Sequence, residues 1–357
     1  MKAGAVSPTG TMKAAVLYGK EDVRIEQVPV PEPRPGDVLL RVEAALTCGT
    51  DVKVFRRGYH ARMIVPPALF GHEVAGTVAD PGTSGLAPGA RVVPANSAPC
   101  GQCEYCRRGK TNLCDDLLFW NGAYAELARI PARIASQNLL LIPDGVSFRQ
   151  AALTEPLACV LRGVEESGIE ANSSVVVIGT GPIGLMFVAL ARQRGAHVVA
   201  AGRSAEAVDK AMAMGAESGV VLSEEEDPAE TLRRGSPGGH GPEIVIDASG
   251  RPETAEAALR AVRKGGVVNL FAGCPAGTRI GVDAQRLHYQ ELTIRSTFHH
   301  TPGSVRAALR LIADGRIDAD AFITGEAPLE RLPDVLRAMA GGAQGLKTAI
   351  VPRAAAG

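Results

Sequence analysis

Four of the chain's seven cysteines lie within one short stretch, CGQCEYCRRGKTNLC, at residues 100–114. Four thiolates can complete a tetrahedral shell around one zinc ion and leave no coordination position open for a substrate. An odd cysteine count favours metal binding over a disulfide framework. An iron–sulfur cluster, a redox relay and a chance cluster are alternatives. We expect a structural zinc ion bound by Cys100, Cys103, Cys106 and Cys114.

A second set of metal-binding side chains is dispersed along the chain. Cys48 opens CGTD, His72 and Glu73 lie in GHEVAG, and Glu155 lies in TEPLAC. One thiolate, one imidazole and one or two carboxylates form a mixed shell with room for water or substrate, which is the composition of a catalytic zinc site. Sequence spacing alone does not show that these residues form one site. Each of them also has an ordinary structural interpretation when taken singly.

Two polar residues follow Cys48 directly. Asp51 can accept the second ring N–H of His72 and so orient the imidazole. Thr50 carries a hydroxyl that can pass on a substrate proton. We treat both as candidate catalytic residues beside the dispersed metal ligands.

A glycine-rich turn follows an apolar strand and precedes an apolar helix. In that context GxGxxG is typical of a dinucleotide site, because glycine lets the backbone approach a pyrophosphate and the helix N-terminus offers N–H groups to it. The alternative is a glycine-rich turn in another α/β protein. The predicted cofactor-binding residues here are Gly179, Thr180, Gly181, Pro182, Ile183 and Gly184.

The end of the next strand indicates which nicotinamide cofactor binds. An acidic residue there would bond the ribose 2′-OH of NAD and repel a 2′-phosphate. This chain has Gly202 at that position, followed by Arg203 and Ser204. A small residue and a cation suit a phosphate, so we predict NADP in preference to NAD. Alternatively, Arg203 is solvated and stacks on adenine.

The hydrophobic pattern changes near residue 172. Residues 13–155 read as short strands separated by Pro and Gly, whereas strands and helices alternate afterwards, as in a doubly wound parallel sheet. The predicted strands are 38–42, 74–78, 174–178, 197–201, 244–247, 267–271 and 348–351. The predicted helices are one running to about 194, and 205–214, 252–263 and 304–314. We expect a Gly/Pro-rich loop at 233–243.

Composition excludes several classes of protein. The chain has 357 residues with 46% hydrophobic and 21% charged, and Lys plus Arg equals Asp plus Glu at 38 each. This balance gives no electrostatic reason to expect nucleic acid or an anionic membrane as a partner. No apolar run reaches spanning length, and the first residues lack an apolar segment typical of secretion. We expect a cytoplasmic protein with a flexible leader at residues 1–11.

These motifs together resemble the zinc-dependent medium-chain dehydrogenase/reductase family of alcohol, sorbitol, glucose and threonine dehydrogenases. CGTD, GHEVAG, the four-cysteine stretch, EPLAC and GTGPIG occur in that order. The resemblance implies an α/β fold with a GroES-like β-rich catalytic domain and a Rossmann domain with a doubly wound parallel sheet. The expected domains are 1–155 and 156–296, with 297–357 returning to the catalytic domain.

The resemblance also assigns roles to residues. Cys48 and His72 match catalytic zinc ligands, Glu73 matches a carboxylate that enters or leaves the shell, and Glu155 matches the third protein ligand. Thr50 matches the proton-relay hydroxyl, and the four clustered cysteines match the structural zinc site. Two positions depart from the pattern: Lys53 stands where many relatives have a relay histidine, and Gly202 stands where an acidic residue is expected.

The implied activity is reversible hydride transfer between a secondary alcohol and NAD(P), with two zinc ions per chain and a homodimer or homotetramer. Glu155 within EPLAC favours a polyol, sugar or cyclitol as substrate, and Trp120, Asn121 and Glu126 are candidates for its pocket. One alternative is an NADPH-dependent biosynthetic ketone or aldehyde reductase, or a threonine-type dehydrogenase. Another is a zinc-stabilised nucleotide-binding sensor or structural protein without turnover.

Overall fold

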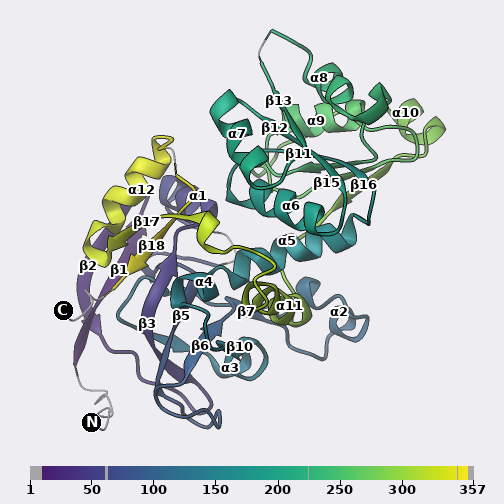
Figure 1. The fold of residues 1–357 in the computed structure, drawn as a ribbon. Helices are drawn as coiled ribbons and strands as arrows, with labels where there is room; N and C mark the ends of the chain where they lie inside the picture. The colour runs from purple at the N-terminus through teal and green to yellow at the C-terminus, as the bar shows by residue number, and fades with distance from the viewer. Residues whose placement is uncertain (1–9, 61–62, 224, 344, 353–357) are drawn as a thin grey trace. The chain divides into compact units, whose positions relative to one another are not determined.

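The computed structural model describes residues 10–60, 63–223, 225–343 and 345–352, and they form two compact units (Figure 1). The first unit contains the chain up to Ala158 and from His300 onward, and the second is Cys159–His299. The predicted divisions were after residues 155 and 296. Residues 1–9 of the predicted leader lie outside the described residues. Thr11 already belongs to the first strand, so the prediction of a leader through residue 11 was too long.

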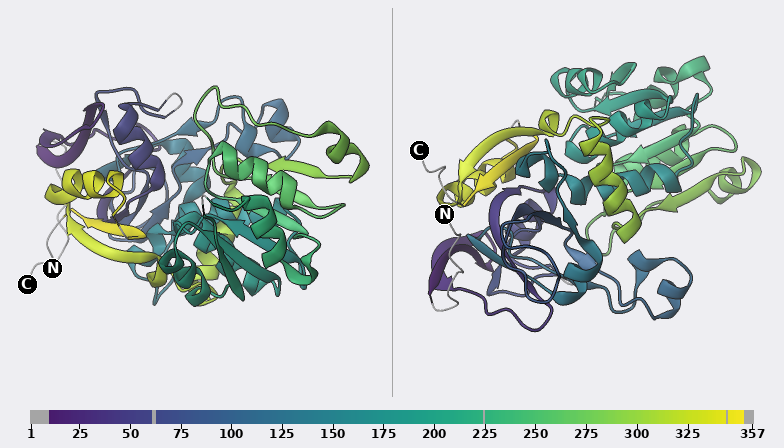
Figure 2. Two further views of the ribbon diagram at one scale, coloured as in Figure 1. Left: turned by 90° about the horizontal axis from the view of Figure 1, so that it is seen from above. Right: turned by 60° about the horizontal axis from the view of Figure 1, so that its bottom comes forward.

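The first unit is built around a sheet whose strands come from both ends of the chain. Within the described residues the strand order is β10-β6-β5-β3-β18-β17, and β9 also pairs with β3. Figure 2 shows the yellow C-terminal strands beside the N-terminal ones of the same unit. The strands are β3 (Val38–Leu46), β5 (Glu73–Asp80), β6 (Arg91–Pro94), β9 (Leu127–Ile130), β10 (Leu139–Leu141), β17 (Ile323–Pro328) and β18 (Lys347–Val351).

Smaller sheets and helices complete this unit. Its further strands are β1 (Thr11–Gly19), β2 (Asp22–Pro29), β4 (Ala68–Leu69), β7 (Ser97–Ala98) and β8 (Leu118–Phe119). Its helices are α1 (Gly49–Arg57), α2 (Glu104–Arg107), α3 (Ala132–Asn138), α4 (Phe148–Ala152), α11 (Pro302–Ala313) and α12 (Leu332–Ala340), with 3-10 turns at η1 (Thr111–Leu113), η3 (Asp320–Phe322) and η4 (Leu329–Arg331). The apolar face of β3 packs into a core that includes Phe70, Tyr124 and Ile350.

The second unit is a parallel sheet in the order β13-β12-β11-β14-β15-β16. Counted along the unit, this is the order 3-2-1-4-5-6 of the doubly wound dinucleotide fold. The strands are β11 (Ser174–Ile178), β12 (His197–Gly202), β13 (Ser218–Val221), β14 (Ile244–Asp247), β15 (Val267–Leu270) and β16 (Thr293–Ser296). The predicted Rossmann sheet and β-rich partner domain are confirmed.

Helices connect these parallel strands. They are α6 (Pro182–Gln193), α7 (Ala205–Ala213), α8 (Pro228–Gly235), α9 (Pro252–Ala261) and α10 (Ala284–Tyr289), with a 3-10 turn η2 (Pro237–Gly239). Helix α5 (Thr154–Glu166) contains the division between the units. The predicted loop at 233–243 was wrong at its start, because Arg233–Gly235 is the end of α8. Asp227 caps that helix and Pro228 occupies its first turn, and both features favour helix initiation.

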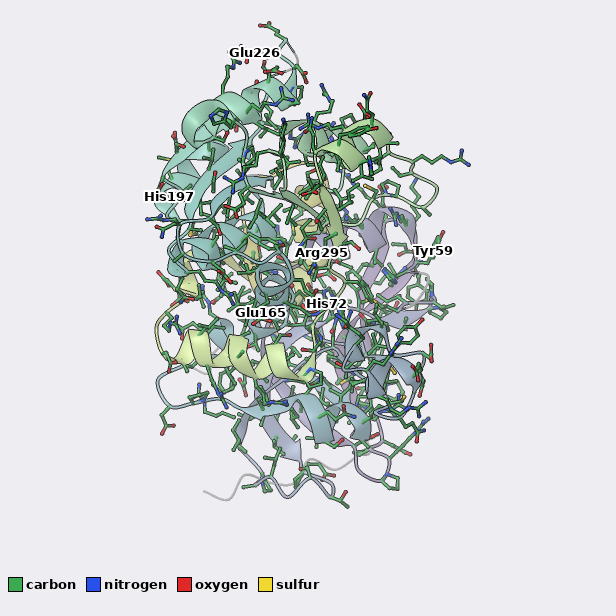
Figure 3. The ribbon with its side chains drawn as sticks, turned by 90° about the vertical axis from the view of Figure 1, so that its right-hand side faces the viewer. Tyr59, His72, Glu165, His197, Glu226 and Arg295 are labelled. Carbon is green, nitrogen blue, oxygen red and sulfur yellow. The ribbon has the colours of Figure 1, made fainter. Side chains whose placement is uncertain are left out.

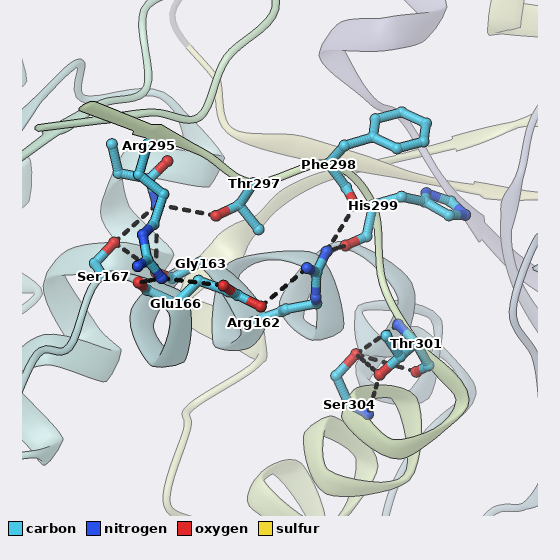
Figure 4. A network of polar contacts seen from close by, with 11 residues as sticks. Arg162, Gly163, Glu166, Ser167, Arg295, Thr297, Phe298, His299, Thr301 and Ser304 are labelled. Atoms are coloured by element: carbon cyan, nitrogen blue, oxygen red, sulfur yellow. Dashed lines mark hydrogen bonds and ion pairs between the residues drawn. The ribbon is translucent and has the colours of Figure 1, made fainter. Parts of the chain in front are cut away.

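A polar network holds the segment that follows β16 (Figure 4). Arg162, on α5, donates hydrogen bonds to the carbonyls of Phe298 at 2.8 Å and His299 at 3.2 Å. His299 has a φ of 65°, which is uncommon for a residue with a side chain. The guanidinium therefore holds the carbonyls on both sides of an unfavourable backbone turn.

In the residues that the structure describes, no helix is long and apolar enough to cross a membrane.

Candidate functional site

Cys48 lies at the start of α1 as its N-cap residue. Its Sγ accepts a hydrogen bond from the N–H of Thr50 at 3.4 Å, and its own N–H donates to Oδ2 of Asp51 at 2.9 Å. This reciprocal pattern is a capping box. The N-terminal end of a helix also favours negative charge, and so favours the thiolate of Cys48. Local helix formation therefore fixes the positions of Cys48, Thr50 and Asp51 together.

His72 and Glu73 reach Cys48 through the pairing of β5 with β3. In that pairing Glu73 lies opposite Leu46, just before Cys48. Gly71, with a φ of 89°, makes the turn into β5, a conformation that glycine adopts without strain. One ligand atom each from Cys48, His72 and Glu73 all lie within 4.8 Å of one another. His72 and Glu73 are buried, and His72 is labelled in Figure 3.

The electrostatics of this group favour a thiolate next to an oriented imidazole. Oδ1 of Asp51 lies 3.2 Å from Nδ1 of His72. Burial lowers the pKa of His72, but the Asp51 carboxylate and the Cys48 thiolate hold it well above its usual value. Burial raises the pKa of Cys48, but the nearby Lys347 and His72 lower it to about 7. Because Nδ1 of His72 faces Asp51, Nε2 is the ring atom available to a metal.

A buried lysine accompanies Glu73. Nζ of Lys347, on β18, donates to both carboxylate oxygens of Glu73 at 2.7 Å and to the carbonyl of Thr47 at 3.0 Å. Burial lowers the pKa of Lys347, but the charges of Glu73 and Cys48 raise it above its ordinary value. Burial raises the pKa of Glu73 well above its usual value, and the Lys347 cation opposes that rise. The lysine therefore favours the ionised carboxylate beside the cysteine and histidine.

Glu155 lies at the start of α5 and is buried. It is not a member of the three-residue group around Cys48. Its Oε1 lies 3.8 Å from Nε2 of His300, whose ring also contacts Oδ1 of Asn96 at 3.0 Å. The structure therefore brings together three of the four predicted ligands and places Glu155 in a neighbouring polar cluster. Lys53, by contrast, is exposed on α1.

The four clustered cysteines form a compact group of their own. Their sulfur atoms all lie within 4.8 Å of one another, and all four cysteines are free thiols. Sγ of Cys103 and Sγ of Cys114 are 3.9 Å apart. Zinc–sulfur bonds of about 2.3 Å in a tetrahedron imply sulfur–sulfur edges of about 3.8 Å. Backbone N–H bonds lower the pKa of Cys103 to about 7. The donor set and its spacing fit one zinc ion.

The glycines of the GTGPIG turn differ in what surrounds them. Gly179 has a φ of 104°, and a Cβ on Gly184 would lie 1.8 Å from the carbonyl oxygen of Gly179. Gly181, the N-cap of α6, has nothing within 4 Å of such a Cβ. Gly184 is therefore required by the packing of helix on strand, whereas Gly181 leaves open space at the helix N-terminus. Such a cradle fits the pyrophosphate of a dinucleotide. The turn also contains Thr180, Pro182 and Ile183.

The end of β12 has little room for an acidic side chain. A Cβ on Gly202 would lie 3.1 Å from Thr180 and 3.2 Å from Val208. Arg203 is exposed. Ser204 caps α7 by accepting a hydrogen bond from the N–H of Ala207 at 3.3 Å. Ser204 thus has a structural function whether or not it contacts a cofactor.

Two of the predicted pocket residues line one cavity, and the third has a structural contact. Trp120 and Asn121 line a cavity of about 500 Å³ whose lining includes neither Cys48, His72 and Glu73 nor Glu155. Glu126 accepts a hydrogen bond from the backbone N–H of Lys13 at 2.9 Å. Of the remaining cysteines, Cys159 is half-buried and Cys274 is exposed.

Two residues of this site were missed from the sequence. Tyr124 donates a hydrogen bond to Oδ2 of Asp51 at 2.6 Å, and Lys347 binds Glu73. A lysine at the start of the apolar strand KTAIV was a visible signal for a buried ion pair, but its partner was not visible. Tyr124 gave no signal, because a tyrosine beside apolar residues is ordinary in a core.

Two family models match the chain. The "Alcohol dehydrogenase GroES-like domain" matches residues 34–144, and "Zinc-binding dehydrogenase" matches residues 182–314. These segments lie respectively in the first unit and mostly in the second.

Curated proteins and solved structures match over nearly the whole length. Sorbitol dehydrogenase of Bombyx mori is 32% identical over 92% of this chain and 96% of its own. D-xylulose reductase A of Aspergillus oryzae is 30% identical over 97% and 98%. A Sinorhizobium meliloti 1021 protein, described as a zinc-binding dehydrogenase and crystallised with NADP, is 32% identical with a TM-score of 0.87, covering 96% of this chain and 100% of that one. The chain belongs to the zinc-dependent medium-chain dehydrogenase/reductase family.

Proposed function

We propose that this protein is a zinc-dependent oxidoreductase that transfers a hydride between a secondary alcohol of polyol, sugar or cyclitol type and NADP. The observation that carries the proposal is the convergence of Cys48, His72 and Glu73, with ligand atoms within 4.8 Å of one another, where Cys48 is half-buried and the other two are buried. Two relatives at or above 30% identity are named as a polyol dehydrogenase and a ketose reductase, which supports the substrate class.

The donor set fits a catalytic zinc site. Cys48 would supply Sγ, His72 would supply Nε2, and a carboxylate would supply oxygen. Both oxygens of Glu73 accept from Lys347, so we propose Glu155 as the third protein ligand. When bound there, zinc is a Lewis acid that lowers the pKa of an alcohol.

The chain's own residues then orient groups and move the proton. Asp51 holds Nδ1 of His72 and so directs Nε2 toward Cys48. We propose that the Thr50 hydroxyl accepts the substrate proton as it releases its own proton to solvent, because Thr50 adjoins Cys48 and is only half-buried. Lys53, exposed on the same helix, is not assigned a relay step.

The four-cysteine cluster supports a second, structural zinc ion, which gives two ions per chain. Its sulfur spacing matches the edge of a zinc tetrahedron, and its four thiols fill every position of that shell. Substrate therefore has no access to this metal.

NADP preference is proposed from the end of β12. Gly202 offers no carboxylate to a ribose 2′-OH, and the exposed Arg203 is free to pair with a 2′-phosphate. The relative from Sinorhizobium meliloti crystallised with NADP supports this choice. Arg203→Ala should lower kcat/KM for NADP more than for NAD, and equal losses with both cofactors would count against it.

A homo-oligomer, dimer or tetramer, is proposed from the exposed edge of the second unit's sheet. All four residues of β16 are exposed, and Ile294 on this strand is 37% accessible. Unpaired edge strands invite pairing with another chain. Light scattering should give a dimer or larger species, and Ile294→Lys should shift it toward monomer.

Seven free thiols support a reducing compartment such as the cytoplasm.

The reductive direction is a second candidate, because one relative is named a reductase. A panel of polyols with NADP and of ketoses with NADPH separates the two directions. The same panel with both cofactors identifies the substrate class.

The decisive experiment replaces the thiolate ligand. Cys48→Ser should abolish turnover and remove about one zinc ion per chain, while nucleotide binding persists. Cys274→Ser is the matched control, because that thiol is exposed and distant in sequence. Full activity in Cys48→Ser would refute the assigned ligand, and wild-type protein that binds both zinc ions and NADP without any turnover would favour a sensor.

A further inference from the structure

Tyr124 is a fully buried tyrosine whose hydroxyl reaches the carboxylate behind His72. Its oxygen lies 2.6 Å from Oδ2 of Asp51 and 3.0 Å from the carbonyl of Leu46. A tyrosine hydroxyl has one proton to donate, and a bond to an ionised acceptor is the shorter and stronger kind. The Tyr124 hydroxyl therefore donates its hydrogen bond to Asp51.

The two oxygens of Asp51 are thereby divided between two tasks. Oδ2 accepts from the N–H of Cys48 at 2.9 Å and from the Tyr124 hydroxyl at 2.6 Å. Oδ1 faces Nδ1 of His72 at 3.2 Å. Two donors on Oδ2 fix the plane of the carboxylate, so Oδ1 stays directed at the imidazole.

Tyr124 also touches the chain segment that leads to His72. Its backbone N–H donates to the carbonyl of Phe70 at 3.0 Å. Its ring lies so close to Gly71 that a Cβ there would meet it at 2.5 Å. One side chain thus contacts the segment before His72 and, through Asp51, the helix cap that contains Cys48.

We infer that Tyr124 is a positioning residue for the mixed metal site: it locks Asp51 and, through it, the orientation of the His72 ring relative to the Cys48 thiolate. The inference rests on the metal site of the proposed function and adds a residue to it. Groups that orient metal-bound histidines commonly change metal affinity when removed. Replacing Tyr124 should therefore change metal retention and ligand geometry more than it changes the stability of the fold.

Tyr124→Phe removes one oxygen and keeps the ring. We expect zinc to leave the mixed site roughly tenfold faster into a chelator, while the four-thiolate zinc leaves at its original rate. After cobalt substitution, the visible absorption of the mixed site should shift. Tyr18→Phe is the matched control, because that hydroxyl also donates to a carboxylate, Glu26 at 2.9 Å, but is exposed. It should change neither readout.

A double-mutant cycle separates positioning from a general structural effect. In an Asp51→Asn background, Tyr124→Phe should no longer alter zinc release, because its target carboxylate is gone. The inference is overturned if Tyr124→Phe matches wild type in zinc release and cobalt spectrum, or if its full effect persists beside Asp51→Asn.

Two further controls keep the result decisive. If Tyr124→Phe lacks a cooperative melting transition, 3-fluorotyrosine placed at position 124 replaces it. Its more acidic hydroxyl should slow zinc release, and an unchanged rate would overturn the inference. If wild-type protein holds zinc only at the four cysteines, the proposed function itself fails. Zinc at both sites with no sensitivity to Tyr124 removes this inference alone.

Discussion

Nζ of Lys347 lies 2.7 Å from each carboxylate oxygen of Glu73, although 274 residues separate the two in the chain. Their side chains are 2% and 0% exposed. Such a pair depends on both partners, because removing one leaves a buried charge without compensation. Strand β18, the last one among the described residues, therefore supplies the counter-charge for a carboxylate beside the proposed catalytic metal.

Lys347→Met should destabilise the protein by about 3–5 kcal/mol, the usual cost of breaking a buried ion pair. Urea unfolding of the metal-free protein measures this loss. Lys13→Met is the control, because Lys13 also pairs across the chain, with Glu330 at 2.6 Å, but with side chains 45% and 47% exposed. That loss should be clearly smaller, because solvent screens an exposed ion pair. Similar losses of unfolding free energy in both variants would show that burial does not increase the contribution of an ion pair to stability.

Cys103→Ala should lower the melting temperature and remove about one zinc ion per chain, because three thiolates cannot close the tetrahedral shell. Metal analysis and calorimetry measure these changes, with Cys274→Ala as an exposed-thiol control. The hydride-transfer step should be affected less than stability. A variant with unchanged melting and assembly but no hydride transfer would contradict the structural role of this cluster.

Two alanine substitutions in the GTGPIG turn should have opposite profiles. Gly184→Ala should lower the melting temperature, because its Cβ would meet the Gly179 carbonyl at 1.8 Å. Gly181→Ala should melt normally, since its Cβ meets nothing within 4 Å, but should bind NADP more weakly by occupying the space left for the pyrophosphate. Calorimetry and fluorescence titration measure the two effects. Normal NADP binding by Gly181→Ala would show that the pyrophosphate does not bind at this turn.

Asp227 should make stability depend on acidic pH. Its two oxygens accept from Arg260 at 2.6 and 2.8 Å, and this pairing holds its pKa below the ordinary value. A lowered folded-state pKa adds stability above the unfolded-state value of about 3.9, and the contribution disappears as pH falls through the folded-state pKa. Because both side chains are more than a third exposed, the contribution is at most about 1 kcal/mol.

The test compares wild type with Asp227→Asn, which keeps an oxygen to cap α8 but loses the charge. The difference in melting temperature should be largest near neutral pH and should vanish below the folded-state pKa. Asp318→Asn, at a carboxylate that accepts from the backbone of Asp320, serves as the control. A constant difference across the pH range would exclude the linkage.

Local pattern predicted the second unit well. Strands β11 and β14 begin and end where the sequence indicated, because each is a short buried run bounded by a change in polarity. The four cysteines needed no tertiary information, since their ligand spacing is contained in one stretch. By contrast, β13 and β16 are exposed along much of their length, so they lack the apolar runs that reveal a strand.

Long-range pairing limited what could be predicted for the site. Cys48, His72 and Glu73 come together through the register of β3 and β5, which no local spacing encodes. The contacts of Tyr124 with Asp51 and of Lys347 with Glu73 join distant segments through buried side chains. Helix α8 was missed because the Gly/Pro-rich stretch at its end and beyond outweighed the cap at Asp227 that starts it.

The pairing of β18 with β3 has a consequence for how the protein is made. The second unit is one continuous stretch and can fold while synthesis continues, as domains generally do. The first unit must wait, because the ribosome reaches Lys347 274 residues after Glu73. At about 5–20 residues per second the delay is about 14–55 s. Throughout that interval the nascent Glu73 lacks the Lys347 cation, so the proposed catalytic site matures only after β18 has been made.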